Sequence, residues 1–412
     1  MRYLLLTVVA LIAAGQNRPT LLSPAQQRID AAEKRVQANP QSWQAYNDLA
    51  LALCRKGRDS GDVAFYDEAE KAVQRSLQFS PGNWDARKLE VTVLLGKHEF
   101  AQALKQAAEL NHQAHDDIGV WGLLVDANVA LGNYDEAERD AQWILDLRRG
   151  SALGFEKAAG LRELFGDIEG AIEFFRETDL RTSQNDTDQR AWLLTQIARL
   201  QLALGNAKVA GELLDQVAKL NPDSQLALAT RAKLQMAEGH YAEAVASLRK
   251  RCDALPSSGN LYDLADALER NGRKEEALAA FQEFETKARA EMAKAFNSNL
   301  DLIYFYADHK NNPAEALALA TQEIKIRHDS PTLDAYAWAL YRNGKYSEAK
   351  TQMDRALAVG IRDPVYFCHA ATIASGVNDT ASANRFQKEL ATMDGNTCTV
   401  ATRVQTARGA TP

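Results

Sequence analysis

The chain has 412 residues, of which 46% are hydrophobic, and its 48 lysines and arginines face 55 aspartates and glutamates, which gives a net charge of −7. This mild acidity argues against a nucleic-acid partner, because binding phosphates requires a basic stripe and no Lys/Arg cluster of that kind occurs. Length alone would suggest two or three globular domains.

The first fifteen residues have the features of a secretory signal peptide. Met1-Arg2 gives a short positive start, Tyr3 to Ala14 is almost wholly apolar, and Ala13-Ala14-Gly15 offers small residues for cleavage. This apolar run is too short to span a bilayer comfortably, and no later segment is apolar enough to do so. We therefore expect cleavage of residues 1–15 and an exported protein, periplasmic or extracellular. An uncleaved anchor or a chance apolar start is the alternative.

Residues 16–40 are expected to carry a single helix. Ser23-Pro24 opens a stretch that continues to about Ala38. This helix would cover the exposed apolar end of the units that follow, and we assign it to an N-terminal cap.

Ten alanines then recur at a nearly constant spacing. Their successive intervals are 34, 34, 34, 39, 34, 33, 39, 33 and 34 residues. Such a period indicates stacked similar units, each touching only its neighbours, so the domain count suggested by length does not apply. The alanines are Ala69, Ala103, Ala137, Ala171, Ala210, Ala244, Ala277, Ala316, Ala349 and Ala383.

Each alanine stands in a similar local pattern. The sequence GNYDEA at 132–137 recurs as GHYAEA at 239–244 and as GKYSEA at 344–349. Apolar residues at helical spacing precede the glycine and follow the alanine, and a proline such as Pro222 closes the second stretch. The glycine can end a helix in the left-handed conformation, and the alanine lets two helices cross closely. The pattern predicts helix-turn-helix units.

These units resemble the tetratricopeptide repeat family, over roughly residues 41–390 and about ten repeats. The resemblance implies an all-α fold in which the units stack into a right-handed α-solenoid superhelix, with the first helix of each unit lining a concave groove. Members that bind chaperone tails grip a carboxylate with lysine, arginine and asparagine. The matching positions here lack positive charge, which disfavours that role: Asn47, Gly122, Glu156, Thr195, Ala229, Tyr262, Asp301 and Asp334.

The two long intervals divide the array. The first contains the polar stretch Thr178 to Gln189, which predicts a loop. The second contains Phe281 to Phe296, without glycine or proline, which predicts a longer helix. The expected domains are repeats one to four at 41–178, repeats five to seven at 188–296, repeats eight to ten at 297–390, and a partly disordered C-terminal tail at 391–412.

The four cysteines fit an exported protein without requiring disulfides. A bridge between Cys368 and Cys398 would fasten the C-terminal end of the stack, and two buried thiols are the alternative. Cys54 and Cys252 are expected to be separate buried thiols.

No enzymatic motif occurs, so we predict no catalytic site and no cofactor. The chain lacks a glycine-rich phosphate loop, a Gly-x-Ser-x-Gly elbow and a Cys-x-x-Cys pair. His112, His115, Asp116 and Asp117 have metal-like spacing but lie at a junction between repeats, where a solvated loop is expected instead of a metal site.

The best candidate for partner binding is the C-terminal part of the predicted groove. The resemblance places its aromatic and acidic side chains on first helices of successive repeats, where they would form one surface. Tyr, Trp and Arg dominate binding hot spots, and the negative field favours a segment carrying Lys or Arg beside apolar residues. The alternative is that the aromatics pack between repeats. The candidates are Tyr262, Asp266, Asp301, Phe305, Asp308, Trp338, Tyr341 and Arg342.

Two functions fit these sequence features. The first is a non-catalytic exported scaffold that binds a protein or peptide partner in the groove. The second is a receptor for a non-protein ligand such as a glycan, stacked on the rings of Trp338 and Tyr341.

Overall fold

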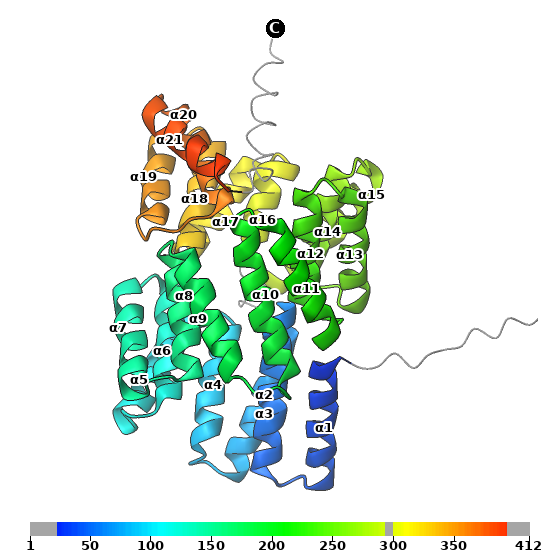
Figure 1. Cartoon of the computed structure of the whole chain (residues 1–412), viewed down its shortest axis with the longest axis vertical. Helices are drawn as coiled ribbons and strands as arrows, with labels where there is room; N and C mark the ends of the chain where they lie inside the picture. The colour runs from blue at the N-terminus through cyan, green and yellow to red at the C-terminus, as the bar shows by residue number, and fades with distance from the viewer. Residues whose placement is uncertain (1–22, 293–299, 394–412) are drawn as a thin grey trace, which may run out of the picture.

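The computed structural model describes residues 23–292 and 300–393, which hold 21 α-helices, one π-helical turn (η1) and no strand (Figure 1). The elements are α1 (Pro24–Ala38), α2 (Trp43–Ser60), α3 (Ala64–Phe79), α4 (Trp84–Gly96), α5 (Phe100–Gln113), α6 (Ile118–Leu131), α7 (Tyr134–Leu147), α8 (Ala152–Leu164), α9 (Ile168–Arg181), α10 (Thr187–Ala203), α11 (Ala207–Leu220), α12 (Gln225–Ala237), α13 (Tyr241–Ala254), α14 (Ser258–Arg270), α15 (Lys274–Met292), α16 (Leu300–Tyr304), η1 (Phe305–His309), α17 (Pro313–Glu323), α18 (Ser330–Arg342), α19 (Tyr346–Leu357), α20 (Pro364–Gly376) and α21 (Thr380–Ala391).

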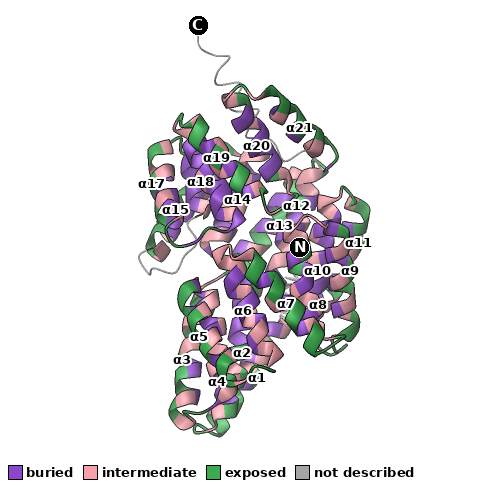
Figure 2. Cartoon of the chain, turned by 90° about the vertical axis from the view of Figure 1, so that its left-hand side faces the viewer, coloured by how far each residue is buried: buried purple, intermediate pink, exposed green. Residues whose placement is uncertain are grey.

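Consecutive helices pack in pairs, from α2 with α3 to α20 with α21, and α1 packs against α2. The predicted all-α solenoid of helix-turn-helix units is confirmed. Buried residues concentrate where neighbouring helices face each other (Figure 2). No helix in the described ranges is long and apolar enough to cross a membrane.

The alanines and glycines of the repeat pattern have the structural roles that their residue types indicate. All ten periodic alanines are buried, with at most 5% of their surface exposed. Gly132 and Gly239 follow first helices at φ of 84° and 79°, where a side chain would be strained. Asp117 caps α6 by accepting from the backbone N–H groups of Gly119 and Val120.

The boundaries differ from the expected ones at one junction. Ser23 caps α1 as the sequence indicates, and α15 is the lengthened helix. The stretch Thr178 to Gln189 is not all loop: α9 continues to Arg181 and α10 begins at Thr187, because Asp186 caps α10. The predicted signal peptide and most of the predicted tail lie outside the described residues.

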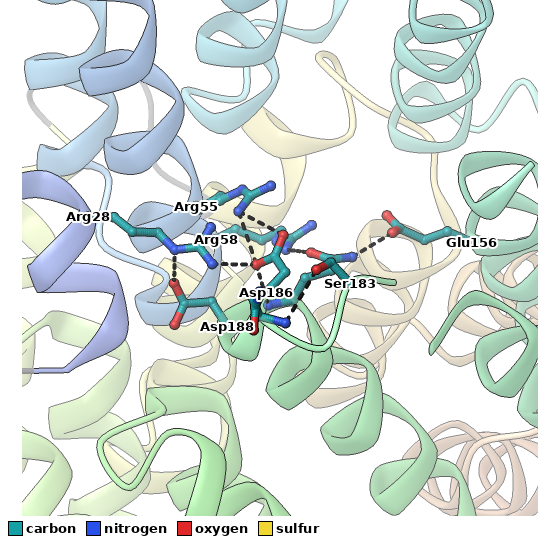
Figure 3. A network of polar contacts seen from close by, with 9 residues as sticks. Arg28, Arg55, Arg58, Glu156, Ser183, Asp186 and Asp188 are labelled. Atoms are coloured by element: carbon teal, nitrogen blue, oxygen red, sulfur yellow. Dashed lines mark hydrogen bonds and ion pairs between the residues drawn. The ribbon is translucent and has the colours of Figure 1, made fainter. Parts of the chain in front are cut away.

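The solenoid contacts itself across distant repeats. In Figure 3, Arg28 of α1 and Arg55 of α2 reach Asp186, at 2.6 and 3.3 Å, and Arg28 also reaches Asp188 at 3.1 Å. Arg58 donates to Gln189 at 2.6 Å. We call Arg28, Arg55, Arg58, Asp186 and Asp188 the inter-turn cluster.

The surroundings of this cluster affect its two carboxyl groups differently. Burial works to raise the pKa of Asp186, but Arg55 and Arg28 hold it below its usual value. Burial raises the pKa of Asp188, whose two oxygens are inaccessible to solvent. Asp186 is therefore the main anionic partner of the arginines.

A second self-contact joins the turn between α17 and α18 to repeats two and three. The hydroxyl of Tyr134 accepts from the backbone N–H of Ser330 at 2.7 Å, and the Arg327 guanidinium lies 5.6 Å from the Phe100 ring centre. A Cβ on Gly132 would lie 2.8 Å from the carbonyl oxygen of His328, so the backbones meet closely there. Both self-contacts draw the first helices around a common interior.

The described cysteines divide into two kinds. Cys54 and Cys252 are free and buried, as expected, and burial raises the pKa of the Cys54 thiol to about 12. Cys368 is disulfide-bonded. Cys398 lies outside the described residues, so its pairing with Cys368 stays a prediction.

Candidate binding site

The interior contains a cavity of about 340 Å³ between two remote parts of the chain. One wall comes from the first helices α10, α12 and α14, and the other from the start of α20. We call this cavity the inner pocket. Two of the eight candidate residues, Tyr262 and Asp266, line it, as do Arg199 and Lys233 at neighbouring first-helix positions.

Most charges at the inner pocket are already paired. The Arg199 guanidinium donates to both Glu163 oxygens at 2.6 Å. Arg270 contacts Asp266 at 2.7 Å, and Asp263 pairs with Arg251. These pairs fix the walls of the pocket and leave little net charge on them.

Lys233 and Asp363 line the inner pocket and have no ion-pair partner among the described residues. The same holds for Asp301, which does not line the pocket but interacts electrostatically with Asp263 and Lys233. The Asp363 carboxylate accepts from the backbone N–H groups of Val365 and Tyr366, which caps α20. Burial raises the pKa of Asp363, and burial together with Asp263 raises that of Asp301 to about 6. Two carboxylates thus face one ammonium group.

The C-terminal aromatics do not lie on an open surface. Trp338 is 0% exposed, and Phe305 and Tyr341 are also buried. The Trp338 indole stacks between Tyr341 and His369, with ring centres 5.2 and 4.3 Å away. The expectation of an exposed aromatic surface was therefore wrong. Phe305 packs against Phe281 and Phe284 of repeat seven, and Trp338 of repeat nine packs against His369 of repeat ten.

The polar candidates of the same region belong to that buried network. Asp308 accepts from the Trp338 Nε1–H at 3.0 Å and from Arg342 at 2.6 Å. Asp334 accepts from the Tyr304 hydroxyl at 2.7 Å and lies 3.0 Å from Nδ1 of His369. Burial works to lower the pKa of His369, but Asp334 holds it above its usual value. These groups stabilise the packing, and a part in partner binding stays a prediction.

One cluster of side chains that could bind a metal was not predicted from the sequence. Ligand atoms of Asp266, Glu269 and His309 all lie within 4.8 Å of one another. No sequence motif indicates this cluster, because His309 is 40 residues from Glu269 and only the fold brings the two side chains together. By contrast, His112, His115 and Asp116 are exposed, and Asp117 binds Trp84 and Lys88.

Two family models match parts of the chain. A tetratricopeptide repeat model matches residues 24–83, which comprise the cap and the first pair, and a bacterial transcriptional activator domain matches residues 181–300. The first match agrees with two earlier observations, the periodic alanines and the paired packing of the helices. The chain is a tetratricopeptide repeat protein. No curated protein matches it significantly.

Solved structures resemble this repeat protein in fold. The Cut9–Hcn1 hetero-tetramer of the APC/C is 14% identical with a TM-score of 0.51, over 84% of this chain. The chain spans 59% of the length of that protein. The human IFIT1 dimer with PPP-AAAA is 14% identical with a TM-score of 0.48, covering 90% of this chain and 95% of that one. A tetratricopeptide repeat protein from Parabacteroides merdae is 14% identical with a TM-score of 0.41, over 59% and 93% of the two chains.

Proposed function

We propose that this tetratricopeptide repeat protein is a non-catalytic scaffold that binds a protein or peptide segment in the inner pocket. The observation that carries the proposal is the pocket itself, built from three successive first helices and closed by α20. Such concave surfaces are the usual binding faces of repeat proteins. The pocket offers a half-buried Tyr262 together with Met236 and Val365, of which Val365 is 42% exposed.

The charges favour a segment with a basic side chain next to an apolar one. Asp363 lines the inner pocket without an ion-pair partner among the described residues, whereas Lys233 is exposed and able to turn away. A lysine or arginine of the partner would compensate the Asp363 carboxylate, and its neighbour would pack on Tyr262. The net charge of −7 does not favour a nucleic acid.

The glycan alternative receives less support. It depended on stacking against Trp338 and Tyr341, and both rings are buried. Tyr262 is the aromatic side chain that the inner pocket offers.

A peptide array tests the proposal. Synthetic peptides that carry Lys or Arg beside Leu or Phe should bind, and their counterparts with Glu in place of the basic residue should not. Asp363→Asn and Tyr262→Ala should each weaken binding about tenfold or more, since a central anchor contributes ~2 kcal/mol. Asp215→Asn serves as the control, because its side chain is 70% exposed on the second helix α11. Equal binding by all three variants would place the site elsewhere.

We also propose that the protein is exported. The motivation is the basic start and apolar run within residues 1–15. Intact-mass analysis of the native protein should give a chain that begins after about residue 15, and a mass that includes Met1 would contradict export by cleavage.

A further inference from the structure

We infer that Asp266, Glu269 and His309 form a zinc-binding site in the wall next to the inner pocket. This inference is independent of partner binding. It rests on the spatial meeting of three side chains that are typical zinc ligands and on a cavity that opens onto two of them.

Two helices bring the three groups together. Asp266 and Glu269 are three residues apart on α14 and therefore share a face. His309 ends η1, where the backbone N–H of Lys310 donates to the carbonyl of Phe305 at 2.9 Å, a five-residue π-type bond. The extra residue of a π-turn rotates the positions that follow by about 100°, and such turns are frequent at functional sites.

The His309 imidazole is firmly held. Its side chain is 8% exposed, its Nδ1 lies 2.9 Å from Glu269, and its ring packs 4.4 Å from that of Phe281 and 5.8 Å from that of Tyr262. A buried, oriented imidazole loses little freedom when it binds a metal. Small side-chain rotations would bring the ligand atoms to the spacing of a tetrahedral site, whose metal–ligand bonds are about 2.0–2.2 Å.

The donor set indicates the metal. One imidazole nitrogen and two carboxylates suit zinc, whereas calcium and magnesium prefer oxygen ligands alone. Three protein ligands would leave a fourth position for water. The two carboxylates neutralise the charge of a divalent ion, so the site is electrostatically balanced once Arg270 releases Asp266.

A zinc ion can bind only if Arg270 releases Asp266 and if a route leads to the ligands, and the structure allows both. Arg270 lines the inner pocket, which gives its side chain room to turn away from Asp266. On the other side, Glu269 and His309 line a second cavity of about 360 Å³, together with Phe281 and Phe305. A hydrated ion can therefore reach the cluster from outside the solenoid stack.

The test is calorimetric titration of ZnCl2 into untagged protein stripped with EDTA. We expect saturable binding of one zinc per chain at this site. His309→Gln should weaken it more than a hundredfold, because removing even an outer partner of a ligand costs about 10–100-fold. The cobalt-substituted protein should show visible absorption that His309→Gln abolishes.

His240→Gln is the matched control. Its imidazole also lies near a carboxylate, 3.5 Å from Glu238, but without a third ligand. Glu269→Gln provides a second site variant should His309→Gln fold poorly. Unchanged zinc affinity in a folded site variant, or no saturable binding by the wild-type chain, would overturn the inference. Peptide binding measured in EDTA keeps this result separate from that of the inner pocket.

Discussion

At the scale of single residues, the pKa of His98 depends on the contact between distant repeats. It occupies the turn between α4 and α5 with a φ of 62°, and its Nδ1 is buried without a hydrogen-bond partner. Burial, and next the positive charge of Arg327, lower its pKa to about 4. Arg327 belongs to the turn between α17 and α18, so the second self-contact keeps His98 neutral.

This lowered pKa predicts acid sensitivity. The unfolded chain takes up a proton at His98 near pH 6.5, while the folded chain resists it until about pH 4. Folding stability should therefore decline as pH falls through this interval. His98→Asn, a residue that tolerates positive φ, should reduce the decline in thermal midpoint between pH 6.5 and 4. Parallel pH profiles for the two proteins would contradict the assignment.

At the scale of helices, the sequence was sufficient to predict the units but not all of their ends or faces. Periodic alanines and glycines act within one repeat, so their spacing predicts the pairs directly. The burial of Trp338 depends on contacts with His369 one repeat away. A first-helix position alone does not distinguish the groove from a contact between repeats, which explains the correction at Phe305, Trp338 and Tyr341.

The close helix crossings at the periodic alanines predict that a larger side chain there lowers stability. Ala137→Leu should force α6 and α7 apart, because Ala137 is 0% exposed, and should reduce the free energy of unfolding by ~1–3 kcal/mol. Ala101→Leu is the control, on the exposed side of α5. Denaturant unfolding compares them, and equal stability of both variants would mean that the crossing accommodates a larger side chain.

At the scale of the whole molecule, the solenoid is closed by contacts that no sequence period reveals. Arg55 and Asp186 are 131 residues apart, and Tyr134 and Ser330 are 196 apart. A repeat pattern describes neighbours only, so neither contact could be predicted from it. The same is true of the inner pocket, whose α20 wall joins α10, α12 and α14 across the interior.

The inter-turn cluster should maintain this closure. Asp186→Ala removes the main anionic partner of Arg28 and Arg55 and leaves two partly buried arginines without it, at a cost of ~1–3 kcal/mol. We expect a larger radius of gyration by small-angle X-ray scattering and a lower thermal midpoint. Asp215→Asn should change neither. An unchanged radius of gyration would contradict this role of the cluster. Closure would then rest on other contacts, such as the hydrogen bonds from Ser224 and Gln225 to Asp59 and the second self-contact.

Site-specific photo-crosslinking in the native host tests partner binding in the inner pocket most directly. A photoreactive residue replaces Val365, which is 42% exposed in the inner pocket, or Leu180, which is 75% exposed on the second helix α9. We expect a discrete polypeptide adduct from position 365, which is lost on adding Asp363→Asn, and no adduct from position 180. Adducts from position 180 alone, or from both positions regardless of Asp363, would contradict partner binding in the inner pocket.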